Sequence, residues 1–196
     1  MTAAATIIPS AASPVATWQI DPAHTHVEFA VRHLMISTVK GRFAEVNGTL
    51  TLPGDDFSQA ELEASINVAS LDTRDPQRDA HLRSADFFDA EAFPTIGFKS
   101  RRVERDPRHE DRWGLVGDLT VRGITREVRL VAVAEGRGRD PWGNDRAGFS
   151  LSGRISRKAF GLTWNQLLET GGVAVGDEVK ISIDTEIVAK PAAVAA

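Results

Sequence analysis

The stretch HTHVEFAVRH, residues 24–33, alternates apolar and polar side chains and decides the fold class. Val27, Phe29 and Val31 fall on one face of an extended chain, whereas Glu28 and Arg32 fall on the other. Because successive side chains of a β-strand point to opposite faces, the pattern predicts a strand with one buried and one solvated face.

The same two-residue period recurs along the chain. One short strand is predicted at 18–21, and eight long strands at 24–33, 42–52, 61–71, 95–103, 113–121, 127–135, 146–157 and 178–188. Turn signals such as Pro53-Gly54 and Arg122-Gly123 separate them. Alternating strands without intervening helices indicate an antiparallel all-β domain, and about eight of them suit a closed barrel.

One helix is expected inside a long crossover between strands. Asp75 is a suitable N-cap, Pro76 suits the first helical position, and residues 77–83 are good helix formers. A second irregular stretch, 158–168, carries large apolar residues outside any strand pattern. Something apolar must cover them.

Length and composition exclude several classes of function. The 196 residues suit one domain. The absence of Cys excludes thiol nucleophiles, disulfides and Cys-ligated metals. The 27 acidic and 23 basic residues give a formal charge of −4, which argues against nucleic acid as a partner.

The two ends of the chain are predicted to lie outside the folded domain. Residues 1–16 are small and apolar but carry no Lys or Arg, so they are interpreted as a disordered leader and not as a secretory signal. Residues 17–189 form the expected domain, and residues 190–196 an expected flexible tail. No stretch of 18 apolar residues occurs. These features predict a cytoplasmic protein.

His24, His26 and Glu28 occupy alternate positions of the first long strand. Two imidazoles and a carboxylate on one strand face can ligate a metal, but this face lies opposite the expected core. We therefore favour a solvated face without a metal. A metal-dependent enzyme that uses these three ligands is the alternative.

The aromatic composition leaves the barrel interior open to two interpretations. Nine Phe, four Trp and no Tyr suit a dry cavity, and they equally suit a packed core. An eight-stranded barrel is the size at which the interior is filled or holds one small ligand. A filled barrel would suit a protein-interaction module.

An ordered set of motifs over residues 18–188 resembles the YceI-like family of polyisoprenoid-binding proteins. These motifs are Trp18-x-Ile20-Asp21-x-x-His24-x-x-Val27-x-Phe29-x-Val31-Arg32-His33, Gly41-x-Phe43, Asp72-x-Arg74-Asp75, Arg78-Asp79-x-His81-Leu82-Arg83-Ser84-x-Asp86-Phe87-Phe88-Asp89, Phe93-Pro94-x-Ile96-x-Phe98-x-Ser100, Gly117-Asp118-Leu119-Thr120-Val121-Arg122-Gly123-Ile124-Thr125 and Arg154-Ile155-Ser156-Arg157-Lys158-Ala159-Phe160-Gly161-Leu162. Two positions depart from the family, because an acidic residue is common at Ala159 and a small hydroxyl residue at His26.

The resemblance implies an antiparallel eight-stranded lipocalin-like barrel with a helix-containing crossover. It further implies a hydrophobic tunnel that holds an isoprenoid chain, such as a quinone tail or a polyprenyl phosphate, or another long-chain lipid. The family is often dimeric and many members are exported. It carries no established catalytic residues, so we expect a lipid carrier or storage protein, not an enzyme. No cofactor is expected besides the bound lipid, and transient membrane contact is compatible with this role.

Two sets of residues are predicted to meet this ligand. The apolar set lines the tunnel and its ends: Val27, Phe29, Val31, Phe43, Ile66, Phe88, Phe98, Leu119, Phe149, Ile155, Phe160 and Trp164. The polar set could face a phosphate or quinone oxygen at the mouth: Arg74, Arg78, His81 and Arg83.

Overall fold

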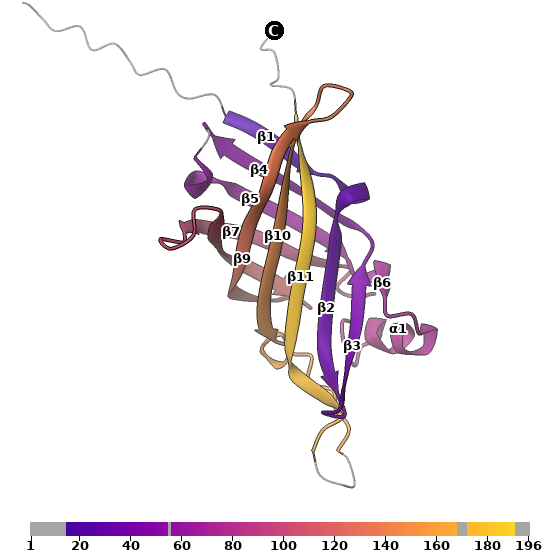
Figure 1. The fold of residues 1–196 in the computed structure, drawn as a ribbon. Coiled ribbons are helices and arrows are strands. Elements are labelled where there is room, and N and C mark those ends of the chain that lie inside the picture. Colours follow the sequence, from indigo (N-terminus) through magenta and orange to yellow (C-terminus); the bar gives the residue numbers. More distant parts are fainter. Residues whose placement is uncertain (1–14, 55, 168–171, 191–196) are drawn as a thin grey trace, which may run out of the picture.

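The computed structural model describes residues 15–54, 56–167 and 172–190. Eleven strands are present there: β1 (Val15–Ile20), β2 (His26–His33), β3 (Ser37–Phe43), β4 (Val46–Pro53), β5 (Glu61–Asn67), β6 (Leu71–Asp72), β7 (Thr95–Arg105), β8 (Arg112–Val121), β9 (Ile124–Arg139), β10 (Asp145–Ser156) and β11 (Val175–Ala189). The helix α1 (Pro76–Arg83) lies in the crossover between β6 and β7, as predicted (Figure 1). None of the described helices is long and apolar enough to cross a membrane.

Eight strands close into an antiparallel barrel in the order β1-β4-β5-β7-β8-β9-β10-β11, and β1 pairs back with β11. This arrangement confirms the predicted fold class. The N-terminal part of β11 pairs with β2 instead, with Val179 opposite Val31, and the sheet continues there through β3 and β6. Opposite residues on β2 and β3 share a face, so Val27 lies beside Phe43 and Val31 beside Val39.

The predicted strand at 42–52 is wrong, because it joins two strands and misses most of β3. The chain turns between Phe43 and Val46, and β3 occupies residues 37–43. The apolar period is weak along β3 because Gly41 stands at a core-facing position between Val39 and Phe43. At the N-terminus, β1 begins at Val15, two residues before the predicted domain start. The rest of the expected leader and residues 191–196 of the tail lie outside the described residues.

The buried side chains form two clusters. The smaller cluster fills the barrel end where β1 meets β11, and its buried members are Trp18, Leu52, Ala60, Ala147 and Ile187. We call it the end plug. The larger cluster includes Val27, Phe43, Phe87 and Phe160, and it brings the α1 crossover and the irregular stretch after β10 against the strands.

Candidate functional site: an apolar cavity in the barrel

A cavity of about 590 Å³ lies inside the barrel. Its wall is mostly apolar and comes from every described strand except β6, together with α1 and the segment after β10. Ligand sites in proteins occupy about 300–1,000 Å³ and are lined by apolar and aromatic side chains with a few polar groups. The cavity therefore has the size and lining of a site for an apolar ligand and does not match the filled-barrel alternative.

Most of the predicted apolar residues lie on this wall. The cavity contacts Val27, Phe29, Val31, Phe43, Ile66, Phe88, Phe98, Leu119, Ile155, Phe160 and Trp164. Phe149 lies elsewhere, because it packs beside the end plug with its ring 5.7 Å from that of Phe57. The two-residue alternation places Phe149 on the inner face of the barrel. It does not reveal which part of the barrel, along its axis, is filled by side chains.

Other wall residues were not singled out from the sequence. Leu62, Ile96, Leu115, Leu130, Leu151, Val179, Ile181 and Ile183 face the cavity from strands that the sequence did predict. Their inward positions in the two-residue period carried the signal. Leu82, Phe87 and Leu162 come from outside the strands, where no period marks the inner side.

Phenylalanine rings form a connected row along one side of the wall. The ring of Phe43 lies 5.6 Å from that of Phe29 and 5.9 Å from that of Phe88. A Cβ on Gly41 would lie 2.4 Å from Phe29 Cζ and 2.8 Å from Thr73 Cγ2. Only glycine leaves room here for the Phe29 ring and for the chain that leads into α1.

The start of α1 fixes its position beside the cavity. The Asp75 carboxylate accepts hydrogen bonds from the backbone N–H groups of Gln77 and Arg78, at 3.1 and 3.2 Å, and Pro76 occupies the first turn. This cap supplies acceptors for N–H groups that have no partner within the helix. The helix thereby presents Gln77, Arg78 and His81 to the cavity.

The four predicted head-group residues separate into two pairs. Arg78 and His81 line the cavity, whereas Arg74 and Arg83 do not. Arg83 instead donates to the backbone carbonyl of Leu71. Arg78 donates to Thr73 and lies 3.6 Å from the Asp75 carboxylate. His81 Nε2 lies 3.0 Å from Asp86, so both wall residues have an acidic neighbour.

A further cation on the wall, Arg157, was not predicted as a site residue. It is only 5% exposed and follows β10 directly. Its guanidinium donates to the backbone carbonyls of Gly176, Leu162, Trp164 and Val175. Burial lowers the pKa of Arg157, because desolvation disfavours the charged form.

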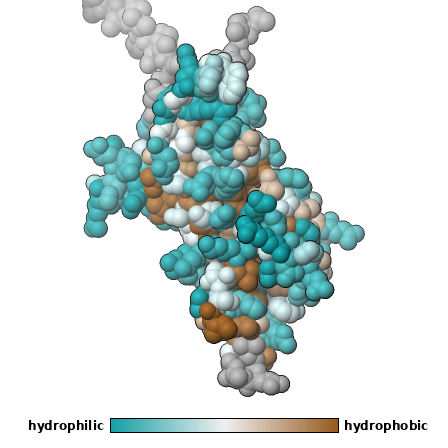
Figure 2. Space-filling model, turned by 45° about the vertical axis from the view of Figure 1, so that its right-hand side comes forward, coloured by the Kyte–Doolittle hydropathy of each residue, from teal (hydrophilic) through white to brown (hydrophobic). Residues whose placement is uncertain are grey.

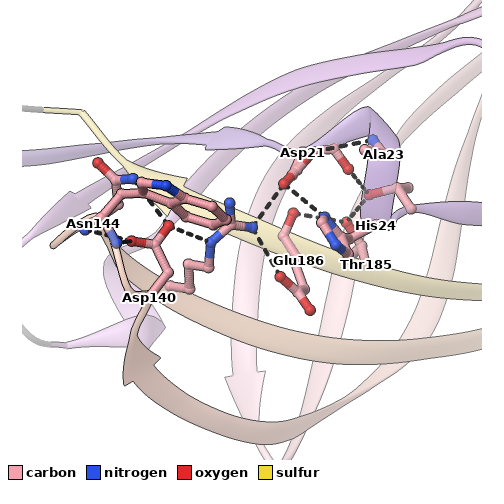
Figure 3. A network of polar contacts seen from close by, with 10 residues as sticks. Asp21, Ala23, His24, Asp140, Asn144, Thr185 and Glu186 are labelled. Atoms are coloured by element: carbon pink, nitrogen blue, oxygen red, sulfur yellow. Dashed lines mark hydrogen bonds and ion pairs between the residues drawn. The ribbon is translucent and has the colours of Figure 1, made fainter.

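The structure does not bring His24, His26 and Glu28 together as one strand face. His24 belongs to a 3-10 turn before β2, and its Nδ1 lies 2.9 Å from Asp21. Among the described residues, the only three potential ligands within reach of one metal are Asp21, His24 and Glu186. Arg146 already contacts both carboxylates of this group (Figure 3). A metal there would compete with a guanidinium, so the metal-enzyme alternative loses its proposed ligand set.

Arg146 joins β10 to the neighbouring chain segments at the plugged end of the barrel. Its guanidinium lies 2.7 Å from Asp21, 2.9 Å from Asp140 and 3.0 Å from Glu186 (Figure 3). The hydrogen bond from Arg146 lowers the pKa of Asp21 below its ordinary value. The pKa of Asp140 is lowered too, first by the side chain of Asn144 and also by Arg146.

The carboxylates of Asp21 and Asp140 make the free energy of unfolding depend on pH. Because their folded pKa values lie below the unfolded ones, their contribution is present above about pH 4 and is lost as the pH falls through the folded values. We expect the free energy of unfolding, measured with urea, to fall below about pH 4. Arg146→Met should flatten this dependence. An unchanged pH slope in the variant would contradict the role given to Arg146.

The closed antiparallel barrel and its cavity place the chain among small β-barrel proteins with an internal apolar site. The YceI-like domain model matches residues 18–187, and the chain belongs to this family. UPF0312 proteins of Staphylococcus aureus strains bovine RF122 and COL are each 36% identical over 167 residues, which cover 85% of this chain and 94% of theirs.

Solved structures share the fold. A YceI protein of Campylobacter jejuni is 28% identical with a TM-score of 0.68, over 82% of this chain and 90% of its own. BcnA of Burkholderia cenocepacia is 22% identical with a TM-score of 0.73, over 85% of this chain and 98% of BcnA. A polyisoprenoid binding domain of Saccharophagus degradans is 13% identical with a TM-score of 0.62, over 88% of this chain and 98% of that domain. The last two show the fold alone.

Proposed function

We propose that this protein binds one long-chain lipid, an isoprenoid or another chain of similar width, inside the barrel and carries or stores it. The apolar cavity of about 590 Å³ is the observation that carries the proposal. Membership of the YceI-like family supports it, as does the fold shared with a domain described as polyisoprenoid binding. The role proposed is binding, not catalysis.

The lining explains how such a ligand would be held. Each buried methylene-sized group contributes about 0.8 kcal/mol, so a long chain binds tightly without directed polar contacts. The phenylalanine row at Phe29, Phe43 and Phe88 offers broad apolar contact along the chain. Affinity is therefore expected to rise with the number of isoprene units until the cavity is full.

Titration with neutral isoprenoid alcohols of increasing length tests this proposal. Farnesol and geranylgeraniol differ by one isoprene unit, and delipidated protein should bind the longer alcohol more tightly. Isothermal titration calorimetry would give the dissociation constants, and a negative heat-capacity change would report burial of apolar surface. Failure of both alcohols, and of a long-chain lipid with a charged head group, to bind would overturn the lipid-binding proposal.

The end of the barrel opposite the end plug carries exposed apolar side chains, which we call the apolar tip: Met35, Ile36 and Leu167, which are 55, 80 and 83% exposed. The backbone N–H of Leu34 donates to Ala174, and the N–H of Ala174 donates to Gln166, so these segments are adjacent. Figure 2 shows a hydrophobic patch at this lower end of the molecule.

The turn in the apolar tip is held in an unfavourable conformation. Leu34 and Met35 have φ values of 50° and 61°, in the left-handed region. Two consecutive hairpin residues with positive φ are ordinarily Asn-Gly. Each non-glycine residue in this region costs about 1–3 kcal/mol. The apolar side chains are therefore placed toward the outside of the molecule at a cost in stability.

We propose that the apolar tip inserts into a lipid bilayer while cargo enters or leaves. Cavity residues His33 and Val175 directly adjoin the tip segments, so cargo leaving a membrane there crosses little water. Three protruding side chains form a small patch, whereas a stable interface between proteins buries about 1,200–2,000 Å². A bilayer therefore suits the patch better than the homodimer expected for the family. The expected cytoplasmic location stays a prediction.

Charge introduced at the apolar tip should weaken membrane binding. We expect Ile36→Glu combined with Leu167→Glu to reduce co-sedimentation with phosphatidylcholine vesicles about 10-fold, because two buried apolar contacts are lost. Trp142→Glu is the matched control, since Trp142 is 82% exposed in the β9–β10 turn at the other end of the barrel. Unchanged vesicle binding, or conversion of a dimer to a monomer by the double variant, would contradict the assignment.

A further inference from the structure

Arg157 differs from the other cations on the cavity wall in how its charge is balanced. Arg78 lies near Asp75, and His81 lies near Asp86. Arg32 also borders the cavity, but it is exposed to water, which screens its charge. Arg157 is 5% exposed and has no carboxylate of the described residues within 4.0 Å.

Asp177, whose charge acts on Arg157, is committed to other partners. Arg157 donates its backbone N–H to the main-chain carbonyl of Asp177. The Asp177 carboxylate accepts hydrogen bonds from the Ser156 hydroxyl, at 2.9 and 2.8 Å, and from the backbone N–H of Lys158 at 3.1 Å. It therefore acts on the guanidinium only from a distance.

Backbone carbonyls hold the guanidinium, and no carboxylate of the described residues lies within 4.0 Å to balance its positive charge. Nε donates to Gly176 at 2.8 Å, Nη1 to Leu162 and Trp164 at 2.5 and 2.8 Å, and Nη2 to Val175 at 3.2 Å. A guanidinium has five N–H donors, so these four bonds leave one N–H of Nη2 without a partner among the described residues. Carbonyl dipoles stabilise the cation, but its charge still acts on whatever occupies the cavity.

The position of Arg157 is also well defined. The ring of Trp164, whose carbonyl accepts from Arg157, lies 4.7 Å from the ring of His81. Arg157, Trp164 and His81 are thus linked to one another in one section of the mostly apolar cavity wall. In such a low-dielectric setting, an anion next to a guanidinium gains more than it would in water.

We propose that Arg157 selects lipids with an acidic head group, a phosphate or a carboxylate, over neutral lipids of the same chain. The inference rests on the proposed lipid-binding function and specifies its ligand. A neutral quinone ring or an alcohol would leave the charge of Arg157 uncompensated, whereas an anionic oxygen would accept its remaining N–H and supply a counter-charge.

Matched pairs of ligands test the proposal on the unmodified protein. Geranylgeranyl monophosphate should bind at least about 10-fold more tightly than geranylgeraniol, and palmitate more tightly than hexadecanol. The two pairs distinguish phosphate from carboxylate as the preferred source of charge. Equal affinity within both pairs would overturn the role of Arg157 but leave the proposed function intact. Failure of all four ligands to bind would overturn both.

Two variants then locate the selectivity. Arg157→Gln should bring the phosphate-to-alcohol ratio close to one and leave the affinity for geranylgeraniol within a few-fold. Arg78→Gln is the matched control, because Arg78 lines the same cavity and already has Asp75 beside it. It should keep the ratio. If Arg157→Gln does not fold, a ratio that survives Arg78→Gln still supports Arg157, and a ratio lost in Arg78→Gln contradicts the proposal.

Discussion

Replacing Phe98 with aspartate is expected to abolish lipid retention. Phe98 lines the cavity from β7, and a Cβ on Gly117 of the neighbouring strand would lie 2.5 Å from its Cζ, so the ring is closely backed. Aspartate would place a carboxylate against an apolar chain, which is costly unless the group is paired. Affinity for a bound isoprenoid should fall by roughly 100-fold or more. Phe29→Asp should act in the same way. Lipid per protein after purification, measured by extraction and mass spectrometry, gives the readout.

Val131→Asp provides the control for this experiment. Val131 lies on β9 of the same barrel and is 37% exposed, on the outer face. The same charge placed there should leave the lipid content unchanged. If folded Phe98→Asp still retained lipid at the level of the parent protein, the cavity would not be the binding site.

The second large effect is expected on stability. Leu52 belongs to the end plug and is 1% exposed, so Leu52→Ala should lower the free energy of unfolding by about 2–5 kcal/mol. Leu119→Ala, in the cavity wall, should cost the lipid-free protein less, on the order of 1–2 kcal/mol. The reason is that a side chain bordering a cavity already lacks neighbours on one side.

Urea denaturation of the delipidated variants checks this difference. Added isoprenoid should raise the stability of Leu52→Ala as much as that of the parent protein, since the end plug does not line the cavity. Equal losses in the two variants would mean that the filled and hollow ends of the barrel are not distinct.

The sequence predicted the barrel well because its information is local. Alternation over β2, β8 and β11 needs only a solvated face and a buried face. The failures occurred where that rule was interrupted. Gly41 stands at an inward position of β3, where the pattern would otherwise show an apolar residue. The side chains of Phe29 and Thr73 occupy the space that a side chain at position 41 would need. The position of α1 followed from Asp75 and Pro76, which act within a single turn.

The residues of the candidate site were harder to predict from the sequence than the strands. Alternation identifies inward side chains but not the level in the barrel at which they lie, so Phe149 was grouped with the wall although it packs beside the end plug. Arg157 cannot be recognised as a site residue from the sequence, because its importance depends on burial and on the carbonyls that surround it. His24, by contrast, left the expected strand because Asp21 caps the turn that contains it.

Native mass spectrometry of freshly purified protein shows whether the barrel holds a lipid. We expect a mass shift that corresponds to about one lipid per chain, and organic extraction should release a long-chain isoprenoid or a similar lipid. Metal analysis of the same sample tests the alternative enzyme. Protein that carries no lipid, and that takes up neither a polyprenyl nor a quinone probe after purification, would contradict the account.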